Sequence, residues 1–163
     1  MAHRYLIALG SNQRHPRLGD PRRVLDAALV ALDVQGITRV AASPIVPSAP
    51  VGPSQRRYAN AAALVESRLD PPQMLARLQA VEALFGRKRQ GQPWRARVLD
   101  LDIVLWSGGA YSVPGLTVPH VHFRDRTFVL GPARHVAPHW RDPITGLSLR
   151  HLYCRLTRPR PLP

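Results

Sequence analysis

The hydrophobic pattern along the chain predicts an alternation of strands and helices. Short apolar runs that suit buried strands occupy residues 5–9, 37–42, 58–65 and 98–106. A helix is expected after the first and the third of these strands, because Asp20-Pro21 and Asp70-Pro71 each combine a helix cap with a proline in the first turn. The resulting order, β-α-β-β-α-β, is typical of a ferredoxin-like α/β (α+β) fold.

The last third of the chain predicts extra helices outside this core. Helical patterns cover residues 127–135 and 147–156, and the proline-rich tail at 158–163 is expected to fray. No linker and no internal repeat interrupts the pattern, and 163 residues suit one domain of ordinary size. The chain is therefore predicted to be a single domain over residues 1–163.

Composition narrows the choice of partner and compartment. The 23 basic residues outnumber the 10 acidic ones, and Lys88 is the only lysine, so arginine carries nearly all of the net charge of +13. Arginine forks match phosphate geometry and indicate an anionic ligand or nucleic acid. The alternative explanation for the arginine excess is a GC-rich genome, in which codons for Arg replace codons for Lys.

A single cysteine excludes an internal disulfide framework and fits a reducing compartment. No apolar run approaches the ~20 residues of a membrane span, and no secretory signal pattern opens the sequence. A cytoplasmic protein that does not enter a membrane is expected.

Asp100 and Asp102 form the sharpest chemical feature. They are two residues apart in a predicted strand, so both carboxylates project from one face, with Cα atoms roughly 6.5–7 Å apart. Two like charges on an apolar strand are costly unless a partner compensates them. A hard dication such as Mg²⁺ would do so together with ligand phosphates and water. A pair of Asp–Arg salt bridges is the alternative.

A basic loop precedes this strand. Residues 86–97 contain two glycines, no acid, and the cationic side chains of Arg87, Lys88, Arg89, Arg95 and Arg97. A mobile cationic loop beside an acidic strand is typical of phosphoryl transfer from a nucleotide, in which acids hold Mg²⁺ on the phosphates and arginines compensate charge in the transition state. Without the acids, the loop would be interpreted as a solvated basic segment.

Weaker signals surround these two features. Tyr58 and Asn60 share one face of their strand and would suit a flat heterocycle with donor and acceptor edges. Phe128 would stack on it, and ordinary packing is the alternative. Trp94 is either a surface aromatic or part of a lid. His120 is placed to donate to a phosphate, whereas zinc would need further ligands that the sequence does not offer clearly.

Short motifs follow one another in order over nearly the whole chain. The most specific are Arg-Val-Leu-Asp-Leu-Asp at 97–102 and Leu-Thr-Val-Pro-His at 116–120. The others are residues 8–12, 51–53, 58–61 and 86–89, with Gln79, Glu82, Arg126 and Phe128. In order and spacing they resemble the 6-hydroxymethyl-7,8-dihydropterin pyrophosphokinase family, whose members transfer a pyrophosphoryl group from ATP to a reduced pterin in folate biosynthesis.

The resemblance implies a three-layer α-β-α arrangement and a role for each matching residue. Asp100 and Asp102 would hold two Mg²⁺ ions, and Arg87 and Arg97 would be catalytic residues that stabilise the transferring phosphates. The co-substrate ATP would be bound by Gln79, Glu82, Arg89, Ile103, Thr117, His120 and Arg126. The pterin would be bound by Ser48, Val51, Tyr58, Asn60, Trp94 and Phe128.

Departures from the family's pattern, Pro93 among them, and two rival functions remain. Family members carry an arginine where Pro93 precedes the loop tryptophan here, and a proline stiffens a loop that is expected to move. A non-catalytic homologue that binds pterin or nucleotide is one alternative. A basic ferredoxin-like RNA-binding module is the other, although the sequence lacks the aromatic pair of an RRM. The expected partners are the two small-molecule substrates, with a monomeric chain and no nucleic acid.

Overall fold

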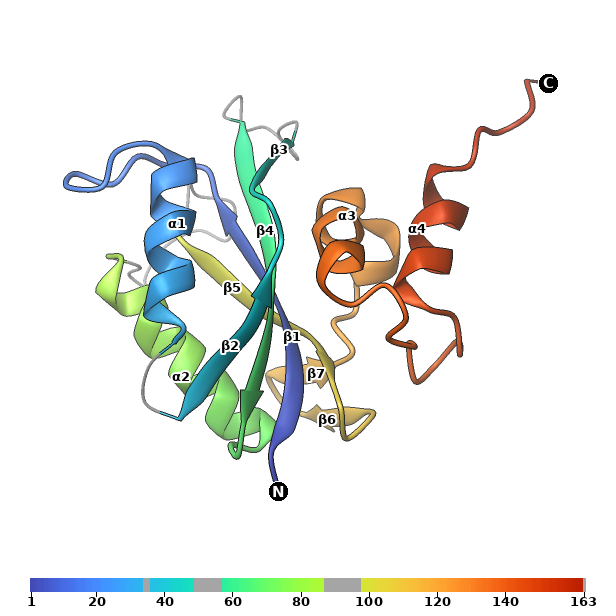
Figure 1. The fold of residues 1–163 in the computed structure, drawn as a ribbon, viewed down its shortest axis with the longest axis horizontal. Coiled ribbons are helices and arrows are strands. Elements are labelled where there is room, and N and C mark those ends of the chain that lie inside the picture. Colours follow the sequence, from blue (N-terminus) through green and yellow to red (C-terminus); the bar gives the residue numbers. More distant parts are fainter. Residues whose placement is uncertain (34–35, 49–56, 87–97, 163) are drawn as a thin grey trace.

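The computed structural model describes residues 1–33, 36–48, 57–86 and 98–162 (Figure 1). The strands are β1 (His3–Ser11), β2 (Ile37–Ala42), β3 (Val46–Ser48), β4 (Tyr58–Ser67), β5 (Asp100–Trp106), β6 (Tyr111–Val113) and β7 (Leu116–Val118). The helices are α1 (Pro21–Ala31), α2 (Pro71–Leu84), α3 (Thr127–Val136) and α4 (Leu149–Thr157), with a 3-10 turn, η1 (Phe123–Asp125). Within these ranges, no helix is long and apolar enough to cross a membrane.

The main sheet is antiparallel throughout, with β1 in its interior. The strand order is β2-β4-β1-β5, so β1 pairs with β4 on one side and with β5 on the other. The short strand β3 pairs with the beginning of β4, and β2 pairs with its end. A separate hairpin of β6 and β7 follows β5.

Each face of this sheet carries its own apolar core, so the fold has three layers (Figure 1). Successive side chains of a strand point to opposite faces. Tyr5, Ile7 and Leu9 of β1 therefore join the core beneath α1 and α2, whereas Leu6 and Ala8 face the core beneath α3 and α4. The chain has a mixed α/β fold in which one antiparallel sheet separates two pairs of helices.

Local sequence explains where α1 and α2 begin and where α2 ends. Asp20 and Asp70 cap the two helices with their side chains. The Asp70 carboxylate accepts from the Gln73 amide at 2.9 Å, and the Gln73 side-chain oxygen accepts from the Asp70 amide at 3.0 Å. Gly86 follows α2 with a φ of 87°, which favours glycine. The helix starts predicted from Asp20-Pro21 and Asp70-Pro71 are confirmed.

Three features differ from the prediction. The strand predicted at 98–106 begins at Asp100, because pairing with β1 ends where Gly10 faces Asp100. The strand β3 at Val46–Ser48 has no counterpart among the predicted strands. The β6–β7 hairpin is absent from the prediction, since strands of three residues leave too little alternation to detect, although Pro114-Gly115 between them is a turn signal.

A buried ion pair joins the segment before α3 to the segment before α4. Asp142 is completely buried and accepts from the Arg124 guanidinium, at 2.6 Å from Nε and 2.8 Å from Nη2. The Thr145 hydroxyl and the Ile144 amide donate to the same carboxylate at 2.7 and 3.0 Å. Burial would raise the pKa of Asp142, but the hydrogen bonds from Arg124, Thr145 and Ile144 outweigh it and lower the pKa to about 2.

A second buried acid ties α2 to β5. Glu82 is 3% exposed, and its Oε1 accepts from the amide of Leu101 at 2.8 Å. Among the described strands, β5 has a neighbour on one side only, and a buried amide on its other side needs another acceptor. The amide lies between Asp100 and Asp102, so α2 helps to fix the backbone that carries both acids.

Stability should depend on pH through Asp142. Its carboxyl group ionises at a pH of about 2 in the folded chain, against 3.8 ordinarily, so the charged form contributes about 2 kcal/mol at neutral pH. Because the folded pKa is the lower one, this contribution is present above about pH 5 and is lost as the pH falls towards 2. In urea unfolding, Asp142→Asn should be less stable than the wild type at neutral pH, and the difference should shrink on acidification. A difference that is constant over this range would contradict the assignment.

Removal of the Glu82 acceptor should destabilise the fold. Glu82→Leu should lower the free energy of unfolding by about 1–3 kcal/mol, because the buried amide of Leu101 loses its partner. Glu82→Gln keeps a carbonyl oxygen and should cost less. Denaturant unfolding measures both, with Asp26→Asn on the exposed face of α1 as the control. Equal losses for the Leu and Gln variants would show that the hydrogen bond is unimportant.

Candidate active site

Antiparallel pairing aligns three strands at one end of the sheet. Gly10 of β1 faces Asn60 of β4 on one side and Asp100 of β5 on the other. Directly paired residues point to the same face, and neighbouring strands are ~4.8 Å apart, so Asn60 and Asp100 rise from one face roughly 10 Å apart. Gly10 adds no side chain to the space between them.

The next row of the sheet carries Asp102. Ala8 pairs with Asp102 on one side and with Ala62 on the other. Ala62 belongs to the core beneath α3 and α4, whereas Leu101 and Ile103 belong to the core beneath α1 and α2. Asp100 and Asp102 therefore both face the α3–α4 side, as their spacing predicts, and the small residues of β1 keep the sheet surface beside them low.

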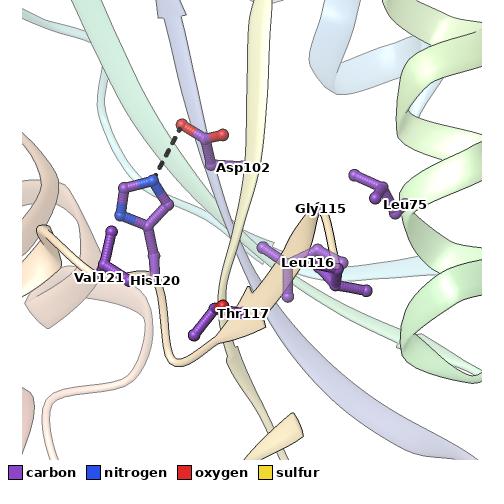
Figure 2. A pocket seen from close by; sticks show the side chains of 8 residues that line it. Leu75, Asp102, Gly115, Leu116, Thr117, His120 and Val121 are labelled. Carbon is purple, nitrogen blue, oxygen red and sulfur yellow. Dashed lines mark ion pairs between the residues drawn. The ribbon is translucent and has the colours of Figure 1, made fainter. Parts of the chain in front are cut away.

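An open pocket of about 310 Å³ lies at the outer edge of β5 (Figure 2). It is lined by Leu75, Asp102, Ile103, Gly115, Leu116, Thr117, His120 and Val121. This volume is at the lower end of the range for small-ligand sites, ~300–1,000 Å³. The pocket unites Asp102, a predicted metal ligand, with three of the predicted ATP ligands, Ile103, Thr117 and His120.

A bulge in β5 anchors His120 beside Asp102. The pairing with β1 shifts by one residue at Val104, and the carbonyl of Val104 accepts from the His120 amide at 3.1 Å. The His120 ring then lies with Nε2 at 3.9 Å from the Asp102 carboxylate, along the dashed line in Figure 2. The polar end of the pocket therefore combines an acid with an imidazole.

The protonation of His120 follows from its contacts. Its Nδ1 accepts from the His122 amide at 3.2 Å, so in the neutral ring the proton lies on Nε2, which faces Asp102. Burial lowers the pKa of His120, and the positive charges of Arg126 and His122 lower it further against the opposing effect of Asp100 and Asp125. His120 thus presents an N–H donor to the pocket without carrying a charge at neutral pH.

Three of the predicted pterin ligands, Ser48, Tyr58 and Asn60, lie near the row of paired residues that Asn60, Gly10 and Asp100 form. Asn60 is buried, and its amide nitrogen donates to the Ser48 hydroxyl of β3 at 2.7 Å. The Asn60 side-chain oxygen lies over Gly10, since a Cβ at position 10 would be 3.7 Å from it. Tyr58 pairs with Ser48 at the start of β4 and is half-buried. Asn60 therefore presents an acceptor towards the Asp100 side of the row.

Arg126 and Phe128 stand together at the start of α3. The Arg126 guanidinium lies 5.7 Å from the centre of the Phe128 ring, within the range of a cation–π contact. Phe128 packs against the core beneath α3, and α3 itself packs on β4 and β3. The first turn of α3 thus carries a cation and an aromatic ring on the side of the sheet that bears Asn60 and Asp100.

Two predicted ATP ligands on α2, Gln79 and Glu82, are not among the residues that line the pocket. Glu82 is directed to the backbone of β5, where it accepts from Leu101, and does not line the pocket. Gln79 is half-exposed and does not line it either. The residue of α2 that does is Leu75, one turn before Gln79, which sequence analysis missed. The helical spacing of four residues between Leu75 and Gln79 was the available signal.

The acid pair suits a hard divalent cation. The side chain of Asp102 is 41% exposed, so water and a ligand can reach it. In the described part of the chain, no three or more His, Cys, Asp and Glu side chains gather as a metal site. Two carboxylates completed by water and phosphate oxygens are the ligands that Mg²⁺ takes in nucleotide sites, whereas zinc takes at least three protein ligands. The residues therefore fit Mg²⁺.

Five predicted site residues lie outside the described ranges. They are Val51, Arg87, Arg89, Trp94 and Arg97. Three further lining residues, Gly115, Leu116 and Val121, are missing from the prediction. Leu116 belongs to the motif at 116–120 and Val121 follows that motif directly, but an apolar side chain gives no sign in the sequence that it lines a pocket.

Comparison with known proteins identifies relatives. Residues 6–138 match the family model described as 7,8-dihydro-6-hydroxymethylpterin-pyrophosphokinase (HPPK). The chain is 42% identical over 145 residues to the 2-amino-4-hydroxy-6-hydroxymethyldihydropteridine pyrophosphokinase of Pseudomonas aeruginosa, covering 88% of this chain and 86% of that protein. The enzyme of the same name from Synechocystis is 34% identical over 151 residues, which cover 92% of this chain and 74% of that protein.

A solved structure shares the fold. It is described as HPPK-DHPS in complex with substrates, and it matches with a TM-score of 0.73 at 11% identity over 94% of this chain. The match spans 44% of that longer chain. At this identity the structural match concerns the fold alone, whereas the family model and the sequence relatives concern descent. On their evidence, the chain belongs to the 7,8-dihydro-6-hydroxymethylpterin-pyrophosphokinase (HPPK) family.

Proposed function

We propose that this chain transfers a pyrophosphoryl group from ATP to 6-hydroxymethyl-7,8-dihydropterin, with Mg²⁺, as a step of folate biosynthesis. Family membership supports the reaction class. The single observation that carries the site assignment is the position of Asp100 and Asp102 on one sheet face, with Asn60 across Gly10 and the pocket at the edge of β5. The strand order β2-β4-β1-β5 supports the ferredoxin-like class of the fold.

Asp100 and Asp102 are the residues that would hold Mg²⁺. When bound, the metal supplies neutralisation of the polyphosphate charge and polarisation of the phosphoryl group under attack. Asp100 shares a row with Asn60 and Asp102 lines the pocket, so a metal held by both would lie where the two proposed substrate sites meet. A bound metal would compensate two like charges on a strand whose other residues are apolar.

The pocket at the edge of β5 is the proposed ATP site. Ile103, Leu75 and Leu116 offer apolar surface to a flat base, and Thr117 offers a hydroxyl. His120 donates from Nε2 next to Asp102, which suits a phosphate oxygen. Arg126 adds a cation to the same side. Glu82 acts on the site through the backbone of β5, as a positioning residue, and its contact with the nucleotide stays a prediction.

The pterin is proposed to lie over Gly10. Asn60 presents an amide edge there, and Phe128, at the first turn of α3, presents an aromatic face. A pterin has both hydrogen-bonding edges and flat faces, so these two side chains recognise different properties of it. Its hydroxymethyl group would point along the row towards Asp100.

The chemistry requires positioning more than a protein base. The pterin hydroxyl oxygen forms a bond to the β-phosphorus of ATP while the bond from that phosphorus to the α,β-bridging oxygen breaks. AMP leaves with the bridging oxygen, and the hydroxyl proton is released to solvent. Such transfers depend on in-line alignment and on compensation of phosphate charge. A monomeric chain in the cytoplasm is part of the same proposal.

Loss of either acid should abolish turnover without unfolding the chain. Asp100→Asn and Asp102→Asn should each lower the rate of AMP formation by at least about 100-fold, because a missing ligand weakens charge compensation in the transition state. Chromatographic measurement of AMP from ATP and the pterin tests this, with circular dichroism to verify folding. Asp26→Asn is the matched control on an exposed helix face. A near-wild-type rate in either acid variant would refute the site assignment.

The pKa of His120 should lie below the ordinary value for histidine, so its ring should stay neutral at a lower pH than a free histidine does. In the chain without ligands, NMR titration should place the pKa of His120 below 6.5, because burial disfavours the charged ring. The Nε2–H tautomer should dominate above it, since Nδ1 accepts from the His122 amide. Observation of the Nδ1–H tautomer would contradict the proposed donation to phosphate.

A further inference from the structure

The Arg124–Asp142 pair holds the segment that carries two proposed ATP ligands. Arg124 lies in η1, four residues after His120 and two residues before Arg126. Asp142 lies beyond residue 138, where the match to the family model ends. The pair therefore connects the segment of the proposed site to a part of the chain outside that match.

Asp142 is mounted on a closed loop. Its amide donates to the Leu147 carbonyl at 2.9 Å, and its carbonyl accepts from the Gly146 amide at 2.8 Å. Arg141 and Ser148 form a β-bridge across the base of the loop, and Ser148 caps α4. The carboxylate accepts four hydrogen bonds, two of them from within this loop. It is a fixed anion rather than a mobile side chain.

The turn that carries Arg124 has little support of its own. The amide of Phe123 donates to His120 at 3.3 Å and that of Asp125 to His122 at 3.4 Å, both longer than the usual 2.9–3.0 Å. No side chain caps η1. Phe123 is buried in the core below, and the Arg124 guanidinium lies 4.6 Å from the centre of its ring. Arg124 is thereby held between an aromatic face and a buried carboxylate.

We propose that Arg124 and Asp142 are positioning residues for the ATP-binding edge of the site. The bidentate pair fixes η1 and so restrains Arg126, which follows η1 directly, and His120, whose carbonyl accepts from the Phe123 amide at the start of the turn, where both side chains meet the phosphates. A bidentate guanidinium restricts both distance and orientation, which a lysine ammonium does not. The inference rests on the proposed function, because the phosphates are those of the proposed ATP site.

Three variants separate positioning from stability. Arg124→Lys keeps the positive charge but loses the fork. The double variant Arg124→Met with Asp142→Leu removes both charges together, and such replacement of a buried pair by apolar side chains is often neutral for stability. Arg4→Lys is the matched control, because Arg4 pairs with Glu66 at 3.0 Å near the other end of β1 and both side chains are partly exposed.

The measurement is the Kd of α,β-methylene-ATP with Mg²⁺, by calorimetry, on chains verified as folded by circular dichroism. Arg124→Lys and the double variant should each bind about tenfold more weakly or worse, because displaced ligands lose much of a positioned contact, and Arg4→Lys should bind as the wild type does. A merely structural pair would lower the melting temperature and leave this Kd unchanged. Wild-type affinity in a folded double variant overturns the proposal, and if that variant does not fold, wild-type affinity in Arg124→Lys does so.

The two proposals fail in different ways. A wild-type chain that binds the analogue but forms no AMP from ATP and the pterin contradicts the proposed function, and the comparison of Kd values still decides the role of the pair. A wild-type chain that does not bind the analogue at all overturns both.

Discussion

The pairing of β1 with β4 and β5 at once is the constraint on which the candidate site depends. Antiparallel strands place directly opposite residues on the same face. The register of one inner strand therefore decides which side chains of its two neighbours lie in the same row. Gly10 brings Asn60 and Asp100 into one row, and Ala8 brings Asp102 into the next. Because the positions on β1 are small, the surface between those side chains stays open to a ligand. A one-residue slip would turn both acids towards the opposite core.

The second constraint is the scarcity of acids. Of the 10 acidic residues, Asp20 and Asp70 cap helices, and Glu82 and Asp142 are buried where backbone or guanidinium donors need an acceptor. Asp100 and Asp102 stand at the proposed site. Six acids thus have positions that local structure or chemistry explains, and the high net charge coexists with a specific use of negative charge. The excess of arginine can reflect the base composition of the genome, while these six acids still have specific structural or chemical roles.

Most of the fold was open to prediction because its signals are local. The caps at Asp20 and Asp70, the glycine after α2 and the apolar periodicity of α1 need only neighbours in sequence. The alternation in β5 likewise predicts that Asp100 and Asp102 share a face. From these local signals, the end of β1 and the start of β5, which lie side by side at Asp100, are predicted to within two residues.

The remainder depends on partners distant in the chain. The family resemblance makes Glu82 a predicted nucleotide ligand, but its hydrogen bond to the amide of Leu101 could not be predicted, because it depends on α2 lying beside β5. The four-residue spacing places Leu75 on the same face of α2 as Gln79, but only the packing of α2 against β5 shows that the pocket lies at Leu75. The Arg124–Asp142 pair joins residues 18 positions apart around an entire helix, and in an arginine-rich chain any of many cations was an equal candidate for that acid.

The bulge at Val104 divides β5 into two halves with opposite phase. Before it, Leu101 and Ile103 pack under α1 and α2. Beyond it, Leu105 packs under α3 and α4, while Trp106 returns to the first core. The strand therefore meets the demands of both layers at its hairpin end without rotating its acidic end. Because the Val104 carbonyl also accepts from the His120 amide, a change in packing at the hairpin end would reach the site through His120, while Asp100 and Asp102 on the other half of the strand would keep their orientation.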